Sequence, residues 1–242
     1  RGHADMYGCI LTPPNDEGAD FGILFLHNEG YSTMCGHAII AITKLAVEMG
    51  WVEKISPITE VIIDAPCGRI QAFAKLVPSE AEGSLLEVAS VYFHCVPSFV
   101  VALDQKIEVA GIGNVEYDLA YGGAFYAYVN STKLGLDLIT ENYSQLIQKG
   151  MAIKRAIMQS DQKIDHPFEE DLSFLYGTIF IGDPVSDGID SRNVCIFAEG
   201  EVDRCPTGSG VSGRMPIHFK RGEIKMKETM TIESITGSVF KG

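Results

Sequence analysis

Residues 36–49 constrain the fold most, because they form a helical pattern that is apolar on nearly all sides. Apolar residues occupy most of its positions, and Lys44 and Glu48 form a charged pair four residues apart. Gly50 follows as a C-terminal cap. A helix with so little polar surface is expected to be buried on most sides. The sequence therefore predicts that other elements surround it.

Those other elements are mostly short strands, which are runs rich in Val, Ile, Phe or Tyr between turn-forming residues. The predicted strands are Gly22–His27, Val61–Asp64, Gly68–Leu76, Leu86–Val96, Lys106–Val109, Phe125–Asn130, Thr178–Ile181, Arg192–Phe197 and Glu228–Thr236. A second helix is predicted from about Glu141 to Met158, with Thr140 as its cap. This mixture predicts an α/β fold in which strands wrap around a helical axle.

A Gly-containing turn near Gly111–Tyr117 predicts a division into two halves. We expect residues 1–116 to form the first half and residues 117–242 the second, each long enough to bury its own core. The chain opens at Arg1 and ends directly after a strand-like run. We therefore expect segments to be missing at one or both ends, including part of the first half.

Charge and cysteine content narrow the functional classes. The formal net charge of −13 argues against a nucleic-acid partner, although local backbone amides can still bind a small anion. No apolar run approaches the roughly 20 residues that a membrane helix needs. The six cysteines are scattered and form no CxxC pair, which argues against a structural zinc site. Such cysteines are typical of reduced thiols, so we expect a cytoplasmic protein.

The first candidate site is the turn Met34-Cys35-Gly36-His37, which leads into the apolar helix. A thiol at a helix N-terminus faces backbone N–H groups and the positive end of the helix dipole, and both favour the thiolate. Gly36 allows a ligand to approach the backbone, and His37 adds a donor. A small buried hydrophobic residue is the equally common role of a free cysteine, and the tetrapeptide alone leaves both open.

The second candidate site is the turn Asp203–Gly210, in which Thr207 precedes three small residues. Successive N–H groups in such a turn can bind an anion. Asp203 is placed to hold a substrate ammonium, and Arg204 or Arg214 to brace the turn. Most Gly-rich turns are only turns. A P-loop is excluded because no GxxxxGK[ST] motif occurs.

Taken together, these motifs resemble one known family. Met34–His37 and Asp203–Gly210 are similar to the two active-site motifs of the proline racemase family, and Gly2–Gly8, Gly30–Thr33 and Tyr121–Ala127 resemble further stretches of it. The resemblance covers nearly the whole chain in the same order. It implies two similar diaminopimelate-epimerase-like halves, each with strands around a central helix, and an active site in the cleft between them.

The resemblance also implies an activity. Racemases and epimerases of this family carry cysteine at both catalytic positions, whereas this chain has Cys35 and Thr207. A threonine hydroxyl is too weakly acidic to act as an α-carbon base near neutral pH. The Cys–Thr pattern resembles the family's dehydratases, in which one base takes the α-proton of trans-3-hydroxy-L-proline and the 3-hydroxyl leaves. The product there is the cyclic imine 1-pyrroline-2-carboxylate.

In that scheme Cys35 is the base, Thr207 donates a hydrogen bond or proton near the departing hydroxyl, and Asp203 binds the ring nitrogen. The resemblance assigns the substrate carboxylate to the backbone of Gly36, His37, Gly208 and Ser209. It implies a small hydroxylated proline as partner and neither a metal nor an organic cofactor. A homodimer is a further expectation.

Three alternatives stay open at this point. A proline or 4-hydroxyproline racemase or epimerase would use another acid for the second face, such as Cys205, where racemases more often carry serine. A non-catalytic amino-acid-binding relative would keep the cleft without turnover. A Cys–His hydrolase would use Cys35 as nucleophile, although no local hydrolase signature accompanies it.

Overall fold

The computed structural model describes residues 6–27, 29–79 and 86–242. The polar start around His3, which resembles the proline racemase family, lies outside the described residues. The described chain forms two compact units. The first, here called the Cys35 unit, contains Tyr7–His27 and Tyr31–Val96. The second, here called the Thr207 unit, contains Pro97–Gly242 together with Met6 and residues 29–30.

The Cys35 unit is a six-stranded sheet with one helix, α1 (Gly36–Glu48). Its strand order is β1-β2-β4-β5-β6, with β3 paired to β2. Strands β2 and β4 run parallel, and the pairs β1–β2, β4–β5 and β5–β6 run antiparallel. The strands are β1 (Tyr7–Thr12), β2 (Phe21–His27), β3 (Gly30–Ser32), β4 (Ile58–Ala65), β5 (Gly68–Pro78) and β6 (Leu86–His94).

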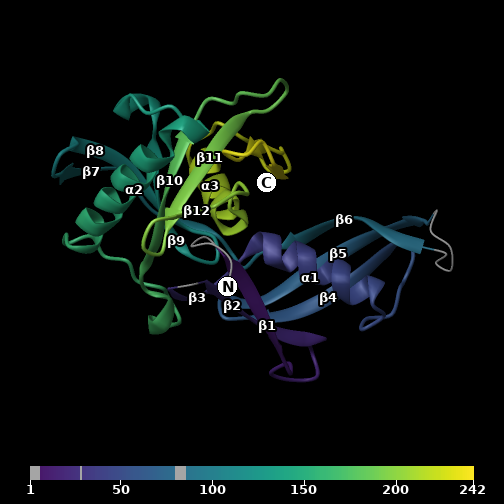
Figure 1. The fold of residues 1–242 in the computed structure, drawn as a ribbon. Helices are drawn as coiled ribbons and strands as arrows, with labels where there is room; N and C mark the ends of the chain where they lie inside the picture. The colour runs from purple at the N-terminus through teal and green to yellow at the C-terminus, as the bar shows by residue number, and fades with distance from the viewer. Residues whose placement is uncertain (1–5, 28, 80–85) are drawn as a thin grey trace. The chain divides into compact units, whose positions relative to one another are not determined.

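Helix α1 lies against one face of this sheet and contacts β5 and β6 (Figure 1). Alternate residues of β5 are buried, as the two-residue period of a strand requires. The apolar face of α1 meets those residues in one core that contains Ile39, Ile42, Val47, Val61, Ile63, Ile70 and Ala72. The helix and its cap agree with the sequence, since Gly50 adopts a positive φ of 71° directly after it.

Helix α1 is exposed along one side, at Ala41, Lys44, Leu45 and Glu48, and its other residues are buried or half-buried. Leu45 is 43% exposed, and Met49, which follows the helix, is 62% exposed. The sheet of the Cys35 unit covers only the face that contains Ile39, Ile42 and Val47. The apolar residues outside that face therefore remain at the surface of the unit.

The Thr207 unit contains an eight-stranded sheet in the order β14-β13-β11-β10-β9-β8-β7, with β12 paired to β11. The pairs β9–β10 and β11–β13 are parallel. The strands are β7 (Phe99–Val109), β8 (Gly113–Tyr121), β9 (Phe125–Asn130), β10 (Leu175–Gly182), β11 (Ser191–Phe197), β12 (Glu201–Val202), β13 (Thr231–Glu233) and β14 (Val239–Lys241). The helices are α2 (Tyr143–Met158) and α3 (Gly208–Arg221), with short 3₁₀ turns at Thr132–Leu134, Thr140–Asn142 and Glu170–Leu172.

Helices α2 and α3 lie on opposite faces of this sheet, α2 against β10 and β11 and α3 against β8 and β9 (Figure 1). The neighbours Thr178 and Ile179 show this, because successive strand residues point to opposite faces. The Thr178 hydroxyl donates to the carbonyl of Gly150 in α2, whereas Ile179 packs against Gly210 in α3. Strand β11 is accordingly buried along its whole length, as strands covered on both faces are.

The two sheets with their packed helices confirm the α/β class and the presence of two sheet-based halves. The division at residues 116 and 117 stays a prediction of domain organisation. That position lies inside β8, which pairs with β7 and β9 in one sheet. The glycines at 111 and 113, both with positive φ, form the turn of the β7–β8 hairpin.

Two local predictions were wrong. Thr140 does not cap α2: it begins a 3₁₀ turn, its hydroxyl donates to Glu141, and Asn142 precedes the helix. The long strand predicted over Glu228–Thr236 shrinks to β13, because β13 pairs only with β11 and β14 over its three residues. Among the described residues, no helix is long and apolar enough to cross a membrane.

Candidate functional site

The Cys35 turn is fixed by hydrogen bonds within its own unit. The Ser32 hydroxyl donates to the Met34 carbonyl at 3.1 Å, and the amide of Cys67 donates to the Thr33 carbonyl at 3.1 Å. Cys35 then occupies the N-cap of α1 with extended backbone, φ −141° and ψ 103°. Its carbonyl accepts the first helical bond from Ile39. The predicted position of the thiol at a helix N-terminus is therefore present.

The thiol of Cys35 makes no cap hydrogen bond, although it is only 5% exposed. A side chain that leaves the cap open does not compete with a bound anion for the first N–H groups of the helix. Those groups carry the positive end of the helix dipole, which favours negative charge on sulfur. The buried start of α1 thus combines a thiol with an anion-stabilising helix end.

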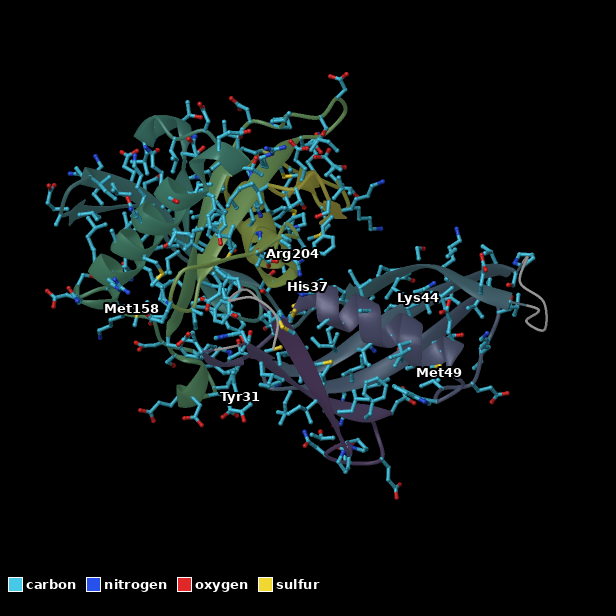
Figure 2. All side chains as sticks on the ribbon, viewed as in Figure 1. Tyr31, His37, Lys44, Met49, Met158 and Arg204 are labelled. Carbon is cyan, nitrogen blue, oxygen red and sulfur yellow. The ribbon has the colours of Figure 1, made fainter. Side chains whose placement is uncertain are left out.

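His37 lies beside this thiol. The distances from Cys35 Sγ to Nδ1 and Nε2 of His37 are 3.5 and 3.4 Å. The edge of the imidazole also packs against Tyr7, with ring centroids 5.6 Å apart. Figure 2 shows His37 at the N-terminal end of α1, with Lys44 and Met49 farther along the helix. An imidazole in this place can exchange a hydrogen bond with the sulfur of Cys35.

The Thr207 turn has a different construction. Thr207 also precedes a helix, α3, but its backbone has φ 67° and ψ 98°. Its hydroxyl donates to Oδ2 of Asp203 at 2.9 Å, and Oδ1 of Asp203 accepts the amide of Cys205 at 3.1 Å. The amide of Thr207 donates to the sulfur of Cys205 at 3.2 Å. The Asp203 carboxylate and the Cys205 sulfur therefore stabilise the turn through hydrogen bonds between its own residues.

Two buried tyrosines hold the first turn of α3. The hydroxyl of Tyr126 lies 2.8 Å from Oγ of Ser209, and the hydroxyl of Tyr128 donates to the Gly210 carbonyl at 2.8 Å. Burial raises the pKa of both tyrosines well above its usual value, so both remain neutral. Ser209 is thus tied to β9 through its side chain, and its backbone faces the helix start.

Gly122 explains part of the Tyr121–Ala127 motif. A Cβ at Gly122 would lie 2.2 Å from the amide nitrogen of Gly213 and 2.3 Å from the carbonyl oxygen of Ser209. Only glycine permits this approach of the β8–β9 turn to α3. The glycine therefore has a packing role, which places the start of α3 close to the sheet.

A further thiol lies next to the turn. Cys195 in β11 is fully buried, and burial followed by the nearby charge of Asp203 raises the pKa of its thiol. It therefore stays protonated. Cys205 is partly exposed, and its sulfur accepts the Thr207 amide.

The structure brings the predicted site residues together in two groups. Cys35, Gly36 and His37 form one group at the start of α1, and the other group consists of Asp203, Thr207, Gly208 and Ser209 at the start of α3. A single site that joins both groups stays a prediction.

Sequence reasoning missed Asn193, which is fully buried and donates to the Pro206 carbonyl at 3.1 Å. A polar Arg-Asn pair at the start of an otherwise apolar strand was the available signal.

A family model described as proline racemase matches residues 1–242. A protein of Colwellia psychrerythraea named trans-3-hydroxy-L-proline dehydratase is 54% identical over 99% of this chain, which spans 65% of that relative's length. A protein of Azospirillum brasilense with the same name is 44% identical over the whole chain, which spans 70% of it. One from Xenopus tropicalis, named trans-L-3-hydroxyproline dehydratase, is 43% identical over the whole chain and 68% of its own length.

Solved structures of a hydroxyproline epimerase and a probable proline racemase are also similar to this chain, at lower sequence identity. A hydroxyproline epimerase from Agrobacterium vitis, with bound trans-4-hydroxy-L-proline, superposes with a TM-score of 0.86 at 32% identity. The match covers 96% of this chain and 65% of that one. A probable proline racemase from Agrobacterium radiobacter K84 has the same TM-score at 30% identity and covers 96% of this chain and 66% of that one.

Proposed function

This chain belongs to the proline racemase family, and from that premise we propose that its protein dehydrates trans-3-hydroxy-L-proline to 1-pyrroline-2-carboxylate. The observation that carries the proposal is Thr207 at the start of α3, because the resemblance of its motif to the family implies that racemases have their second cysteine at this position. A threonine hydroxyl cannot take an α-proton near neutral pH. Relatives at 43 to 54% identity that are named as dehydratases of this substrate support the choice.

The proposed reaction needs one base. The thiolate of Cys35 takes the α-proton, so an S–H bond forms as the Cα–H bond breaks. The electron pair forms a double bond to C3, and the C3–O bond breaks. The hydroxide leaves as water once it has gained a proton, and the enamine then tautomerises to the cyclic imine. The helix ends at Gly36 and Gly208 stabilise the negative charge that develops on the substrate carboxylate.

In the proposed reaction Asp203 binds the ring ammonium of the substrate, and Thr207 acts on the departing hydroxyl. In the structure the Thr207 hydroxyl donates to Oδ2 of Asp203. When the ring ammonium of the substrate binds the Asp203 carboxylate, the threonine hydroxyl can donate its hydrogen bond to the departing hydroxyl instead. Any proton that the threonine passes to this leaving group is replaced from water, so that the threonine ends the step as a neutral hydroxyl. His37 lies within hydrogen-bond distance of the Cys35 sulfur, where a ring N–H can donate to the thiolate.

The direct test is incubation of the full-length protein with trans-3-hydroxy-L-proline and detection of the cyclic imine by mass spectrometry. The matched substrate is trans-4-hydroxy-L-proline, whose hydroxyl is not adjacent to the α-carbon and cannot leave in this step. We expect imine from the first and none from the second. Folded protein that binds trans-3-hydroxy-L-proline without product would support the non-catalytic binding alternative.

A racemase or epimerase is the second candidate, because the sulfur of Cys205 lies 3.2 Å from the amide of Thr207. Chiral chromatography of proline and trans-4-hydroxy-L-proline after incubation tests it. Inverted product that disappears in Cys205→Ala would favour this activity over dehydration. Under our proposal, inversion requires Thr207→Cys, which restores a thiol at the second position.

We also propose that the protein works in the cytoplasm and as a homodimer on a small-molecule substrate. The six free cysteines support a reducing compartment. Light scattering of the full-length protein tests the dimer, and a monomeric mass would contradict it.

A further inference from the structure

Thr207 has a backbone conformation that its residue type disfavours. A positive φ brings Cβ close to the backbone, and a β-branched residue there is an outlier that the surroundings must hold. Thr207 has φ 67°, and it is 5% exposed. The hydrogen bonds to Asp203 and Cys205 come from within the turn, so they cannot by themselves anchor the turn to the fold.

An anchor comes from β11. The side chain of Asn193 donates from Nδ2 to the carbonyl of Pro206 at 3.1 Å. That carbonyl belongs to the peptide that precedes Thr207, so this bond fixes the rotation of the peptide that sets the φ of Thr207. Asn193 has no exposed surface, and its amide is therefore shielded from competing water.

Arg214 in turn holds Asn193. Its Nη1 donates to Oδ1 of Asn193 at 2.8 Å, its Nη2 donates to Oγ of Ser191 at 2.8 Å, and its Nε donates to Nε2 of His218 at 2.9 Å. Arg214 is 2% exposed. Burial lowers the pKa of its guanidinium to about 10, and it remains charged at neutral pH. A charged donor on Oδ1 polarises the amide and strengthens the bond from Nδ2.

Arg214 belongs to α3, the helix that follows Thr207. Arg214 lies two turns into α3, and its bond to Asn193 returns to the peptide before that helix. The same side chain therefore links the start of α3 to β11.

We propose that Asn193 and Arg214 are positioning residues for Thr207, which orient the Pro206–Thr207 peptide so that the threonine hydroxyl stands at the reacting centre. This inference rests on the proposed dehydratase function. A hydroxyl misplaced by about 1 Å costs on the order of 100-fold in rate, whereas substrate binding through the helix ends remains.

The test is Asn193→Asp in the full-length protein. Aspartate has nearly the same shape and still accepts from Arg214, but it presents an oxygen instead of a donor to the Pro206 carbonyl. We expect kcat for trans-3-hydroxy-L-proline to fall about 10- to 100-fold, with KM changed less than about 3-fold. The rate of alkylation of Cys35 by iodoacetamide should match that of the wild type.

The matched control is Thr178→Val, which removes a buried hydrogen bond of the same unit on the opposite face of the sheet, from Thr178 to Gly150. It should lower the Tm without lowering kcat. If Asn193→Asp reduces kcat no more than this control does, the inference is overturned. If the wild type forms no imine at all, the proposed function fails instead.

Asn193→Ser is the second variant, because its hydroxyl is too short to bridge Arg214 and Pro206 and it introduces no charge. A comparable loss of kcat in the folded serine variant supports the proposal. If neither variant folds, Asn193 and Arg214 are needed for folding of the unit, and a specific role in positioning Thr207 is overturned.

Discussion

Cys35 and Thr207 each precede a helix, but the two turns are built differently. Cys35 has an ordinary extended backbone, and its side chain contacts His37 two residues away. Thr207 has a positive φ, its hydroxyl is bound to Asp203, and its preceding peptide is anchored to β11. A base must be able to gain and lose charge, whereas a hydrogen-bond donor must be held in place. The two proposed roles therefore have different structural requirements.

The largest effect should come from Cys35→Ser. Replacing the thiol by a hydroxyl removes the only proposed base, and we expect kcat to fall by at least about 10³-fold. Cys9→Ser, at an exposed thiol of β1, is the control and should retain full activity. Imine formation measures both. Retained activity in Cys35→Ser would show that Cys35 is not the base, and the two turns would then not differ in function as proposed.

The next largest effect should be a loss of stability when the ion pair between Arg192 and Glu233 is broken. Glu233 is fully buried and accepts from Arg192, Val185 and Ser186. Arg192→Met leaves that carboxylate without its cation, and we expect a loss of about 3–5 kcal/mol in the free energy of unfolding. Urea titration measures it. A loss below about 1 kcal/mol would show that the Thr207 unit does not depend on this pair.

The same carboxylate gives a pH dependence. Burial raises the pKa of Glu233, but the hydrogen bonds from Val185, Ser186 and Arg192 outweigh burial and lower the pKa to about 2. Its stabilisation is present above the ordinary glutamate pKa and is lost as pH falls from there toward 2. The stability gap between wild type and Arg192→Met should therefore narrow over that range. A gap that stays constant would contradict the assignment.

Thr207→Ala and Thr207→Gly separate activity from backbone strain. Both remove the hydroxyl, and we expect kcat to fall about 100-fold in each. Glycine accepts the positive φ, so the glycine variant should be more stable than the alanine variant by about 1 kcal/mol. Urea midpoints measure this difference. Equal stabilities would show that Thr207 is not strained, and the contrast with Cys35 would then rest on hydrogen bonds alone.

The smallest effect concerns His218, which accepts from Arg214 in the Thr207 unit. Burial, then the charge of Arg214, lowers the pKa of this imidazole. The unfolded chain therefore binds a proton more readily, and stability falls as pH drops below about 6.5. His218→Gln should flatten this decline by less than about 1 kcal/mol, measured by thermal unfolding between pH 5 and 8. An unchanged slope would assign the decline to other groups.

Local patterns in the sequence predicted the elements well where an apolar run is bounded by turn-forming residues. The helix that follows Cys35 and the strand Phe125–Asn130 agree closely with the structure. Strand β8 was missed because Gly111 and Gly113 dominate the start of that stretch. Strand β1 was missed because four of its six residues are exposed, so its sequence carries no buried face.

Residue type and order alone were enough to predict the two motifs and the family, and the motif around Thr207 led to the proposal that a threonine stands where racemases of the family have a cysteine. Only the tertiary structure revealed the positive φ of Thr207, the bond of its hydroxyl to Asp203, and the anchor through Asn193 and Arg214. The backbone angle of Thr207 and its bond to Asp203 follow no periodic pattern of residue types, and the bonds from Asn193 and Arg214 join residues 13 and 21 positions apart in the chain. They form only when the sheet brings β11 beside the start of α3.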